Sequence, residues 1–154
     1  MNSFENYKEV KTIIIQENVR QFLLKNNLAK YSCIYYPNVS KTPGIIGCVE
    51  YDNEWITYQT DERGKTYNVL KFDDIYLAFN NVLERFSVEF DLNSYNDFDP
   101  ITLLGMAKKH LEFKIEQHIG NDENRRWFEY KLNIIDNYLK NDRSITKKFS
   151  KHIN

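Results

Sequence analysis

Residues 45–71 carry the pattern that most restricts the fold, because short runs rich in apolar residues alternate there with turn residues. Three runs are predicted to be strands: 45–51, 54–60 and 65–71. Two turn segments separate them: Asp52-Asn53 and Asp61-Glu62-Arg63-Gly64. Short strands joined by tight turns favour antiparallel neighbours rather than strand–helix–strand crossovers. An earlier run, 31–36, is predicted to be a further strand, and Pro37, Pro43 and Gly44 punctuate the loop after it.

The middle strand shows the two-residue period of extended backbone, in which successive side chains point to opposite faces. One face is expected to carry Trp55, Thr57 and Gln59. The other is expected to carry Ile56, Tyr58 and Thr60. At least one of Trp55 and Tyr58 should therefore face a core, because they lie on opposite faces of the strand.

Helical periodicity flanks the strands on both sides. The clearest helix begins at Asp73, the expected N-cap, with Asp74 beside it at the positive end of the helix dipole. Its apolar residues follow the i, i+3, i+4, i+7 spacing: Ile75, Ala78, Phe79, Val82, Leu83 and Phe86. Further helices are predicted over 5–27, 100–119 and 122–139. The second of these starts with an Asp99 cap and Pro100, and Gly120-Asn121 ends it.

These elements predict the α+β class, with an N-terminal helix, an antiparallel β meander of three to four strands, and then three helices packed on the sheet. The 154 residues suit a single domain, 1–154, with a basic and mobile tail at about 141–154. The first helix should be amphipathic, with polar Lys8, Lys11, Glu17 and Lys25 between its apolar residues.

Charge is unevenly distributed along the chain, although the net charge is only -1. Residues 50–100 hold twelve acidic and four basic groups, whereas the segments before and after are net basic. An acidic middle of this size attracts a basic partner and repels nucleic acid. A solvated acidic face without a partner is the other interpretation.

Motifs of catalysis are missing from the sequence. There is no Gly-x-Ser-x-Gly elbow and no Gly-rich phosphate loop, and the carboxylate pairs lie at turns or helix starts. His110 and His118 lack metal-site partners, and Cys33 and Cys48 fall in predicted strands. We therefore expect a protein without catalysis, metal or cofactor.

The N-terminal segment has acidic residues and no apolar core of the kind that a secretory signal needs, and no apolar run is long enough to span a bilayer. Two cysteines make no disulfide framework. We expect a cytoplasmic protein with reduced thiols and no membrane association.

Candidate partner-binding residues combine exposed charge with aromatic side chains, as protein interfaces do. They lie in the two turns and in the Asn- and Asp-rich loop 89–99. The residues are Asp52, Glu54, Asp61, Glu62, Arg63, Glu89, Asp91, Tyr95, Asp97, Phe98 and Asp99. For each of them, packing or helix capping is the alternative role.

The run 47–64 contains the spacing Trp-x-x-Tyr-x-x-x-Glu-Arg-Gly, at Trp55, Tyr58, Glu62, Arg63 and Gly64, followed by an amphipathic helix. This hairpin and helix, over about residues 45–86, resemble the small immunity proteins of bacterial polymorphic toxin systems. The resemblance implies a cytosolic protein that binds a cognate toxin, encoded by the adjacent gene, and occludes its active site without turnover.

A different class remains open: a nucleic-acid-associated or regulatory protein of a mobile element. It would use the basic residues Arg125, Arg126 and Lys131 of the last helix, together with the tail. The sequence pI of about 6.3 and the lack of a helix-turn-helix or RNP-type motif argue against it. An uncharacterised hydrolase is the third and weakest possibility.

Overall fold

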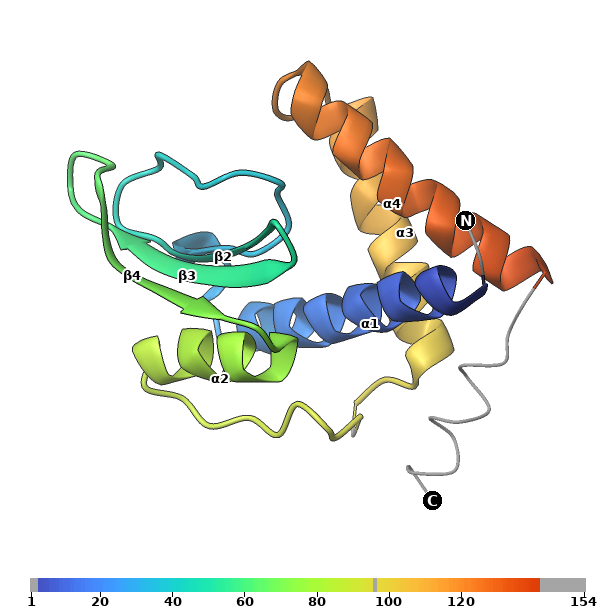
Figure 1. Cartoon of the computed structure of the whole chain (residues 1–154), viewed down its shortest axis with the longest axis horizontal. Helices are drawn as coiled ribbons and strands as arrows, with labels where there is room; N and C mark the ends of the chain where they lie inside the picture. The colour runs from blue at the N-terminus through green and yellow to red at the C-terminus, as the bar shows by residue number, and fades with distance from the viewer. Residues whose placement is uncertain (1–2, 96, 142–154) are drawn as a thin grey trace. The chain divides into compact units, whose positions relative to one another are not determined.

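The computed structural model describes residues 3–95 and 97–141, and side chains within 7–95 and 97–140 (Figure 1). The elements in chain order are α1 (Ser3–Lys25), η1 (Ala29–Tyr31), β1 (Ser32–Cys33), β2 (Ile46–Tyr51), β3 (Glu54–Thr60), β4 (Thr66–Phe72), α2 (Ile75–Arg85), α3 (Pro100–Glu116) and α4 (Asp122–Asn141). The predicted α+β class is confirmed. The predicted basic tail falls almost entirely outside the described residues.

The chain divides into two compact units, which share α1. The sheet unit comprises residues 19–92, and the helical unit comprises 1–18 and 93–154. The single-domain interpretation remains a prediction. In the described part of the chain, no helix has both the length and the apolar character needed to cross a membrane.

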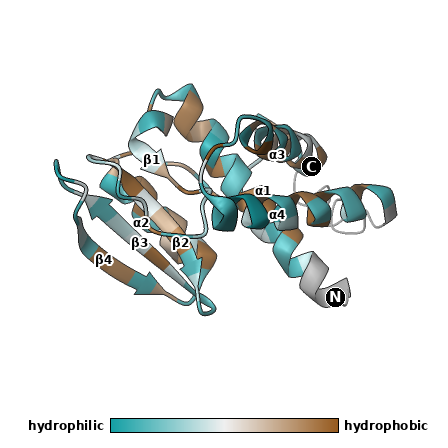
Figure 2. Cartoon of the chain, turned by 90° about the horizontal axis from the view of Figure 1, so that it is seen from above, coloured by the Kyte–Doolittle hydropathy of each residue, from teal (hydrophilic) through white to brown (hydrophobic). Residues whose placement is uncertain are grey.

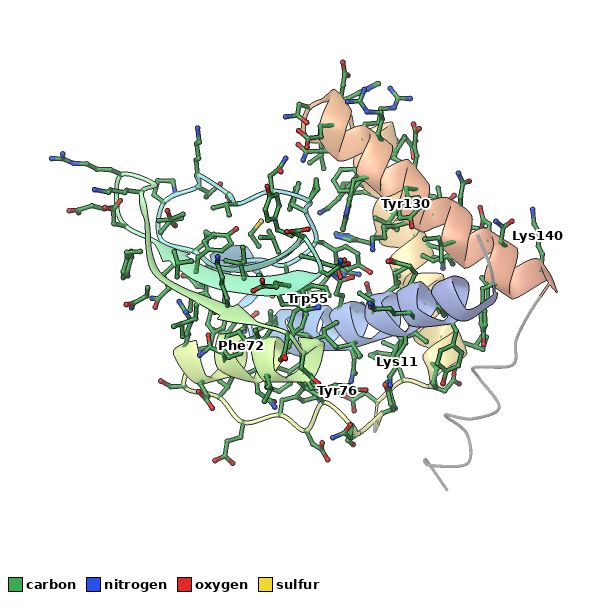
Figure 3. All side chains as sticks on the ribbon, in the orientation of Figure 1. Lys11, Trp55, Phe72, Tyr76, Tyr130 and Lys140 are labelled. Atoms are coloured by element: carbon green, nitrogen blue, oxygen red, sulfur yellow. The ribbon has the colours of Figure 1, made fainter. Side chains whose placement is uncertain are left out.

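The sheet has the strand order β1-β2-β3-β4. β2, β3 and β4 form the predicted antiparallel meander, with Tyr51 opposite Glu54. Trp55 of β3 is the register partner of Phe72 of β4, and both residues are labelled in Figure 3. The prediction was wrong for the first strand, since β1 contains only Ser32 and Cys33 and pairs with β2 in parallel. The loop between β1 and β2 carries the chain back to the same end of the sheet, as parallel pairing requires.

The predicted alternation along β3 is confirmed, and both of its faces are covered (Figure 1). On one face the Trp55 ring lies 5.9 Å from Phe79 of α2, and the Thr57 hydroxyl donates a 2.7 Å hydrogen bond to Asn81. On the other face Tyr58 is fully buried with Ile45 and Val49. Trp55 and Tyr58 are therefore both core residues.

α2 is capped one residue later than predicted. Asp74, not Asp73, is the N-cap, and its carboxylate accepts hydrogen bonds from the backbone N–H groups of Tyr76 and Leu77. Asp74 has the extended backbone that a cap needs. The buried face of the helix, Ala78, Phe79, Val82 and Leu83, is as predicted.

α1 is not the amphipathic helix that its spacing predicts. Every residue from Thr12 to Val19 is buried, including Glu17, which has no exposed surface. A helix buried on all sides lacks a solvent-facing stripe, so its polar residues cannot be assigned to a surface from periodicity.

The helical unit is built on α3 and α4, which pack against each other. α3 begins as predicted, with Pro100 in its first turn and the Asp99 carboxylate accepting from the Thr102 N–H at 2.8 Å. It ends at Glu116, before the predicted residue 119, because His118 adopts a left-handed backbone with φ 54°. α4 is held to α1 by a 2.7 Å ion pair between Lys131 and Glu9.

Candidate functional site

The predicted partner-binding residues do not form one cluster. Asp52 and Glu54 are exposed at the β2–β3 turn, whereas Asp61, Glu62 and Arg63 lie at the β3–β4 turn. These turns are at opposite ends of β3, about 20 Å apart at the rise of an extended chain. The remaining candidates, at 89–99, are divided between the two units.

The β2–β3 turn presents an aromatic ring beside carboxylates. Its two central residues, Asp52 and Asn53, have φ values of 52° and 63°, as in the type I′ turns that match the twist of a hairpin. The flanking register partners, Tyr51 and Glu54, are both exposed. Tyr51 is 70% exposed, the highest value among the exposed large hydrophobic residues of the described chain. We call Tyr51, Asp52 and Glu54 the acidic hairpin.

Further carboxylates lie at the same end of the sheet. Trp55 and Phe72 are register partners, so Glu54, which precedes Trp55, comes close to Asp73, which follows Phe72. Asp73 and Asp74 are exposed, like Asp52 and Glu54. The acidic hairpin is therefore part of a negatively charged end of the sheet.

The β3–β4 turn is built by Asp61. Its Oδ1 accepts hydrogen bonds from the N–H groups of Arg63 and Lys65, and these bonds hold the pKa of the carboxyl below its usual value. Gly64 has φ 82°, and a Cβ there would lie 2.1 Å from the carbonyl oxygen of Lys41. Only Glu62 and Arg63 project from this turn, so Asp61 and Gly64 are structural.

The lowered pKa of Asp61 gives an expected pH dependence. A carboxyl with a depressed folded-state pKa contributes stability above its unfolded pKa, and this stability is lost as the pH falls through the folded value. We expect Asp61→Asn, which retains an oxygen acceptor, to flatten the acid limb of stability against pH. Urea unfolding from pH 7 to pH 2 measures this. An unchanged acid limb would assign the pH dependence to other carboxyls.

The loop 89–99 uses most of its residues for packing or capping. The Phe90 ring stacks on Phe22 at 4.4 Å, Tyr95 and Phe98 are half-buried, and Asp99 caps α3. Glu89, Asp91 and Asp97 are exposed. Exposed carboxylates are thus not combined in this loop with an exposed aromatic ring, as they are in the acidic hairpin.

The motif that carries the family resemblance is mainly structural. Trp55, Tyr58 and Gly64 are buried, and the Tyr58 hydroxyl accepts a 2.8 Å hydrogen bond from the Ser40 N–H. Glu62 and Arg63 are its only exposed members. The Trp-x-x-Tyr-x-x-x-Glu-Arg-Gly spacing therefore reflects mainly the packing of the hairpin, and only Glu62 and Arg63 are placed to contact a partner.

A reactive thiol and a metal centre are two kinds of site that the described residues do not provide. Burial raises the pKa of Cys48 far above the neutral range, so its thiol stays protonated. No group of three His, Cys, Asp or Glu residues among those described could hold a metal ion.

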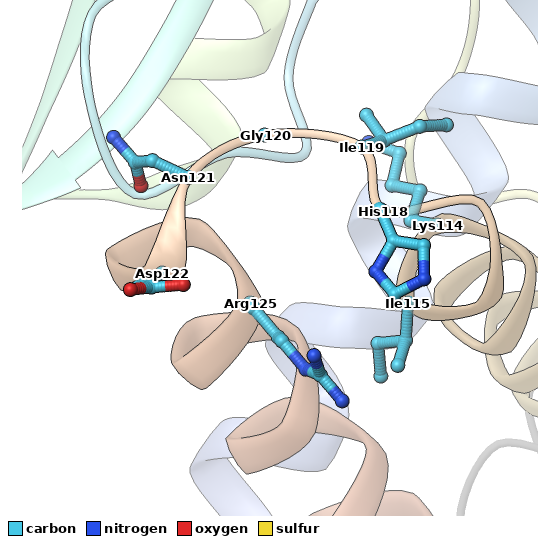
Figure 4. Close-up of a pocket in the computed structure, with 8 residues that line it drawn as sticks. All are labelled: Lys114, Ile115, His118, Ile119, Gly120, Asn121, Asp122 and Arg125. Atoms are coloured by element: carbon cyan, nitrogen blue, oxygen red, sulfur yellow. The ribbon is translucent and has the colours of Figure 1, made fainter.

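A hollow at the α3–α4 connection gathers Lys114, His118 and Arg125 (Figure 4). The nearby N-terminus of α4 is capped by side chains: the Asn121 N–H donates to Asn124 Oδ1, and the Asn124 N–H donates to Asn121 Oδ1. This reciprocal capping occupies the N–H groups of Asn121 and Asn124, which are then not available to bind an anion in the hollow.

One of the basic residues of α4 that were predicted to contact nucleic acid, Lys131, is buried. Lys131 is 3% exposed, paired with Glu9, and its Nζ lies 5.2 Å from the centre of the Trp127 ring. Arg125 pairs with Glu129 at 3.0 Å. Of the three predicted phosphate contacts on this helix, Lys131 is unable to reach a phosphate.

Substitution tests this assignment. We expect Lys131→Ala to lower the free energy of unfolding by about 1–2 kcal/mol, because Glu9 loses its partner in a half-buried position. Arg126→Ala, at an exposed position of the same helix, should change it by less than about 0.5 kcal/mol. Equal effects in urea unfolding would contradict the buried role of Lys131.

The acidic hairpin is the best-formed candidate binding surface of the described chain, and sequence reasoning found its carboxylates but not Tyr51. Comparison of the chain with family models, with curated proteins and with solved structures found no match.

Proposed function

We propose that this chain is an immunity-type protein that binds a cognate toxin domain in the cytoplasm and blocks its active site without catalysis. The observation that carries the proposal is the acidic hairpin, where a 70% exposed tyrosine stands beside Asp52 and Glu54. The resemblance of residues 45–86 to toxin-neutralising proteins supports the same function.

The geometry of the hairpin suits tight binding. The turn has two residues in left-handed backbone and is joined to a strand whose two faces are packed, so Tyr51 is presented on a rigid support. A rigid aromatic side chain loses little conformational entropy on binding, and tyrosine is enriched among the residues that dominate interface energies. The carboxylates accelerate association with a basic cleft.

A toxin that acts on nucleic acid needs a basic cleft for the phosphate backbone. Carboxylates on the hairpin, with Asp73 and Asp74 at the same end of the sheet, present negative charge to such a cleft. A polypeptide that fills it excludes the substrate and has no reaction of its own to perform. Occlusion therefore requires only complementarity between the two surfaces.

Co-expression tests the function directly. The toxin domain encoded beside this chain should kill cells when expressed alone and should be tolerated when the chain is co-expressed. The purified pair should form a one-to-one complex by light scattering. Equal killing with and without this chain would overturn the proposal, as would rescue that occurs without any complex.

A further inference from the structure

β4 is an edge strand with an exposed apolar surface. It is last in the strand order, and no described strand pairs with its outer edge. Tyr67, Val69 and Leu70 are 44%, 51% and 48% exposed, and Figure 2 shows hydrophobic stretches along the strand. An exposed apolar edge is a template for pairing with another strand. A monomeric protein would normally protect such an edge more fully with charge or cover it with a loop, whereas β4 carries a single charged residue, Lys71.

A β-bulge limits where pairing can occur. Leu70 is opposite Thr57 and Tyr67 is opposite Gln59, so β4 has one more residue than β3 in this interval. Asn68, in the bulge, has a left-handed φ of 52°. The regularly extended part of the edge is therefore the segment after Asn68, and Leu70 lies near its middle.

Arg85 of α2 is fixed beside the bulge. Its guanidinium donates to the carbonyl oxygen of Asn68 at 2.6 Å and to Thr57 Oγ1 at 3.0 Å. Two further donated bonds reach Asn81 Oδ1 at 2.9 Å and Gln59 Oε1 at 3.3 Å. All four acceptors are neutral, so a fixed positive charge marks this end of the edge, and no carboxylate in the described part of the chain bonds to it.

The opposite end of the same edge is net acidic, since the exposed Asp73 and Asp74 follow directly after β4 and outnumber Lys71. The edge therefore has a positive and a negative end. Antiparallel pairing of two identical edges brings each positive end against a negative end. Parallel pairing brings like charges together and is disfavoured.

We propose that two copies of this chain pair through β4 in antiparallel orientation, with Leu70 of each copy on the two-fold axis. An axis at Lys71 would place two lysines opposite each other, and an axis at Val69 would run through the bulge. With Leu70 central, Asp73 of the second copy lies at the end where Arg85 is held. The two sheets then continue into one, and each contact occurs twice by symmetry.

The dimer and the proposed function share Asp73, but Leu70, on which the dimer is tested, lies on the edge strand and outside the acidic hairpin. Sedimentation equilibrium should give twice the chain mass of 18.5 kDa for the unmodified protein. Leu70→Lys and Leu70→Glu each place like charges on the axis and should weaken dimerisation at least about tenfold. As a monomer, each variant should unfold at the same temperature as the monomeric unmodified protein, since Leu70 is half exposed.

Mixing the two variants is the decisive step. Leu70→Lys and Leu70→Glu chains should recover dimerisation as a heterodimer, since opposite charges then meet on the axis. Phe113→Lys, at a 54% exposed position of α3, is the matched control and should leave the dimer unchanged. A chain that stays at 18.5 kDa at every concentration would overturn the proposal. So would a dimer that neither Leu70 variant weakens, or one that mixing fails to restore.

Discussion

Tyr51→Ala is expected to weaken binding of the cognate toxin domain by about 30- to 1,000-fold, or about 2–4 kcal/mol. The reason is that Tyr51 is the exposed aromatic residue of the hairpin and is held by a strand whose own side chains are packed. The folded state should lose less than about 0.5 kcal/mol, because the ring is 70% exposed. Titration calorimetry with the toxin domain and urea unfolding separate the two effects.

The charges of the hairpin should act mainly on the association rate. Asp52→Asn removes the charge and keeps a residue type that tolerates the left-handed φ of 52°. Glu54→Lys reverses the charge at an exposed strand position. Both should slow association at low salt, with a smaller difference at high salt, where the charges are screened.

Phe113→Ala is the matched control for Tyr51, since it removes an exposed aromatic ring from α3. It should leave toxin binding unchanged. If Tyr51→Ala and Phe113→Ala bind the toxin with equal affinity, the acidic hairpin is not the binding surface. The proposed function would then have to rest on a different part of the chain, such as Glu62 and Arg63.

Features set by local sequence were predicted well. The turns at 52–53 and 61–64 and the cap of α3 at Asp99 each depend on residues a few positions apart. The alternation along β3 also follows from local pattern. These features were predicted because turn residues, capping residues and the spacing of apolar side chains all indicate the same local structure.

Features set by distant contacts were missed. The parallel pairing of Ser32 with Ile46 depends on the path of a long loop, which periodicity does not encode. Glu17 and Lys131 were expected on solvent-facing surfaces and are buried. A charged residue is normally exposed, so its burial becomes visible only when its surroundings are known.

The candidate site shows the same division. Asp52 and Glu54 were predicted from turn chemistry, but Tyr51 was read only as a strand residue. Its exposure follows from its position beside the turn, where the end of the sheet leaves the ring uncovered. A strand-terminal aromatic beside a two-residue turn of polar residues is the signal that could have found it.

Gly47→Ala is expected to be the most damaging single-methyl substitution in the sheet, at about 3 kcal/mol. Gly47 is the register partner of Tyr58, and the Tyr58 ring lies across it. A Cβ on Gly47 would come within 2.3 Å of Cζ of that ring. The ring is fully buried and its hydroxyl is bonded to the Ser40 N–H, so it cannot move aside without losing packing and a hydrogen bond.

Gly105→Ala provides the contrast in α3. A Cβ at Gly105 meets no atom within 4 Å, so alanine there should stabilise the helix by about 0.5–1 kcal/mol through its higher helix propensity. Urea unfolding of both variants should therefore give shifts of opposite sign. Two shifts in the same direction would show that the space around Gly47 is not what decides its effect.

A double-mutant cycle tests whether Tyr58 is the cause. Tyr58→Leu removes the ring atoms that a Cβ on Gly47 would strike, although it also costs stability by itself. In that background Gly47→Ala should cost less than about 1 kcal/mol, so the two substitutions should couple strongly. An undiminished cost would place the strain elsewhere in β2. A large coupling would show that the tyrosine of the Trp-x-x-Tyr spacing needs a glycine on the neighbouring strand. The short motif would then depend on a residue eight positions before its first member.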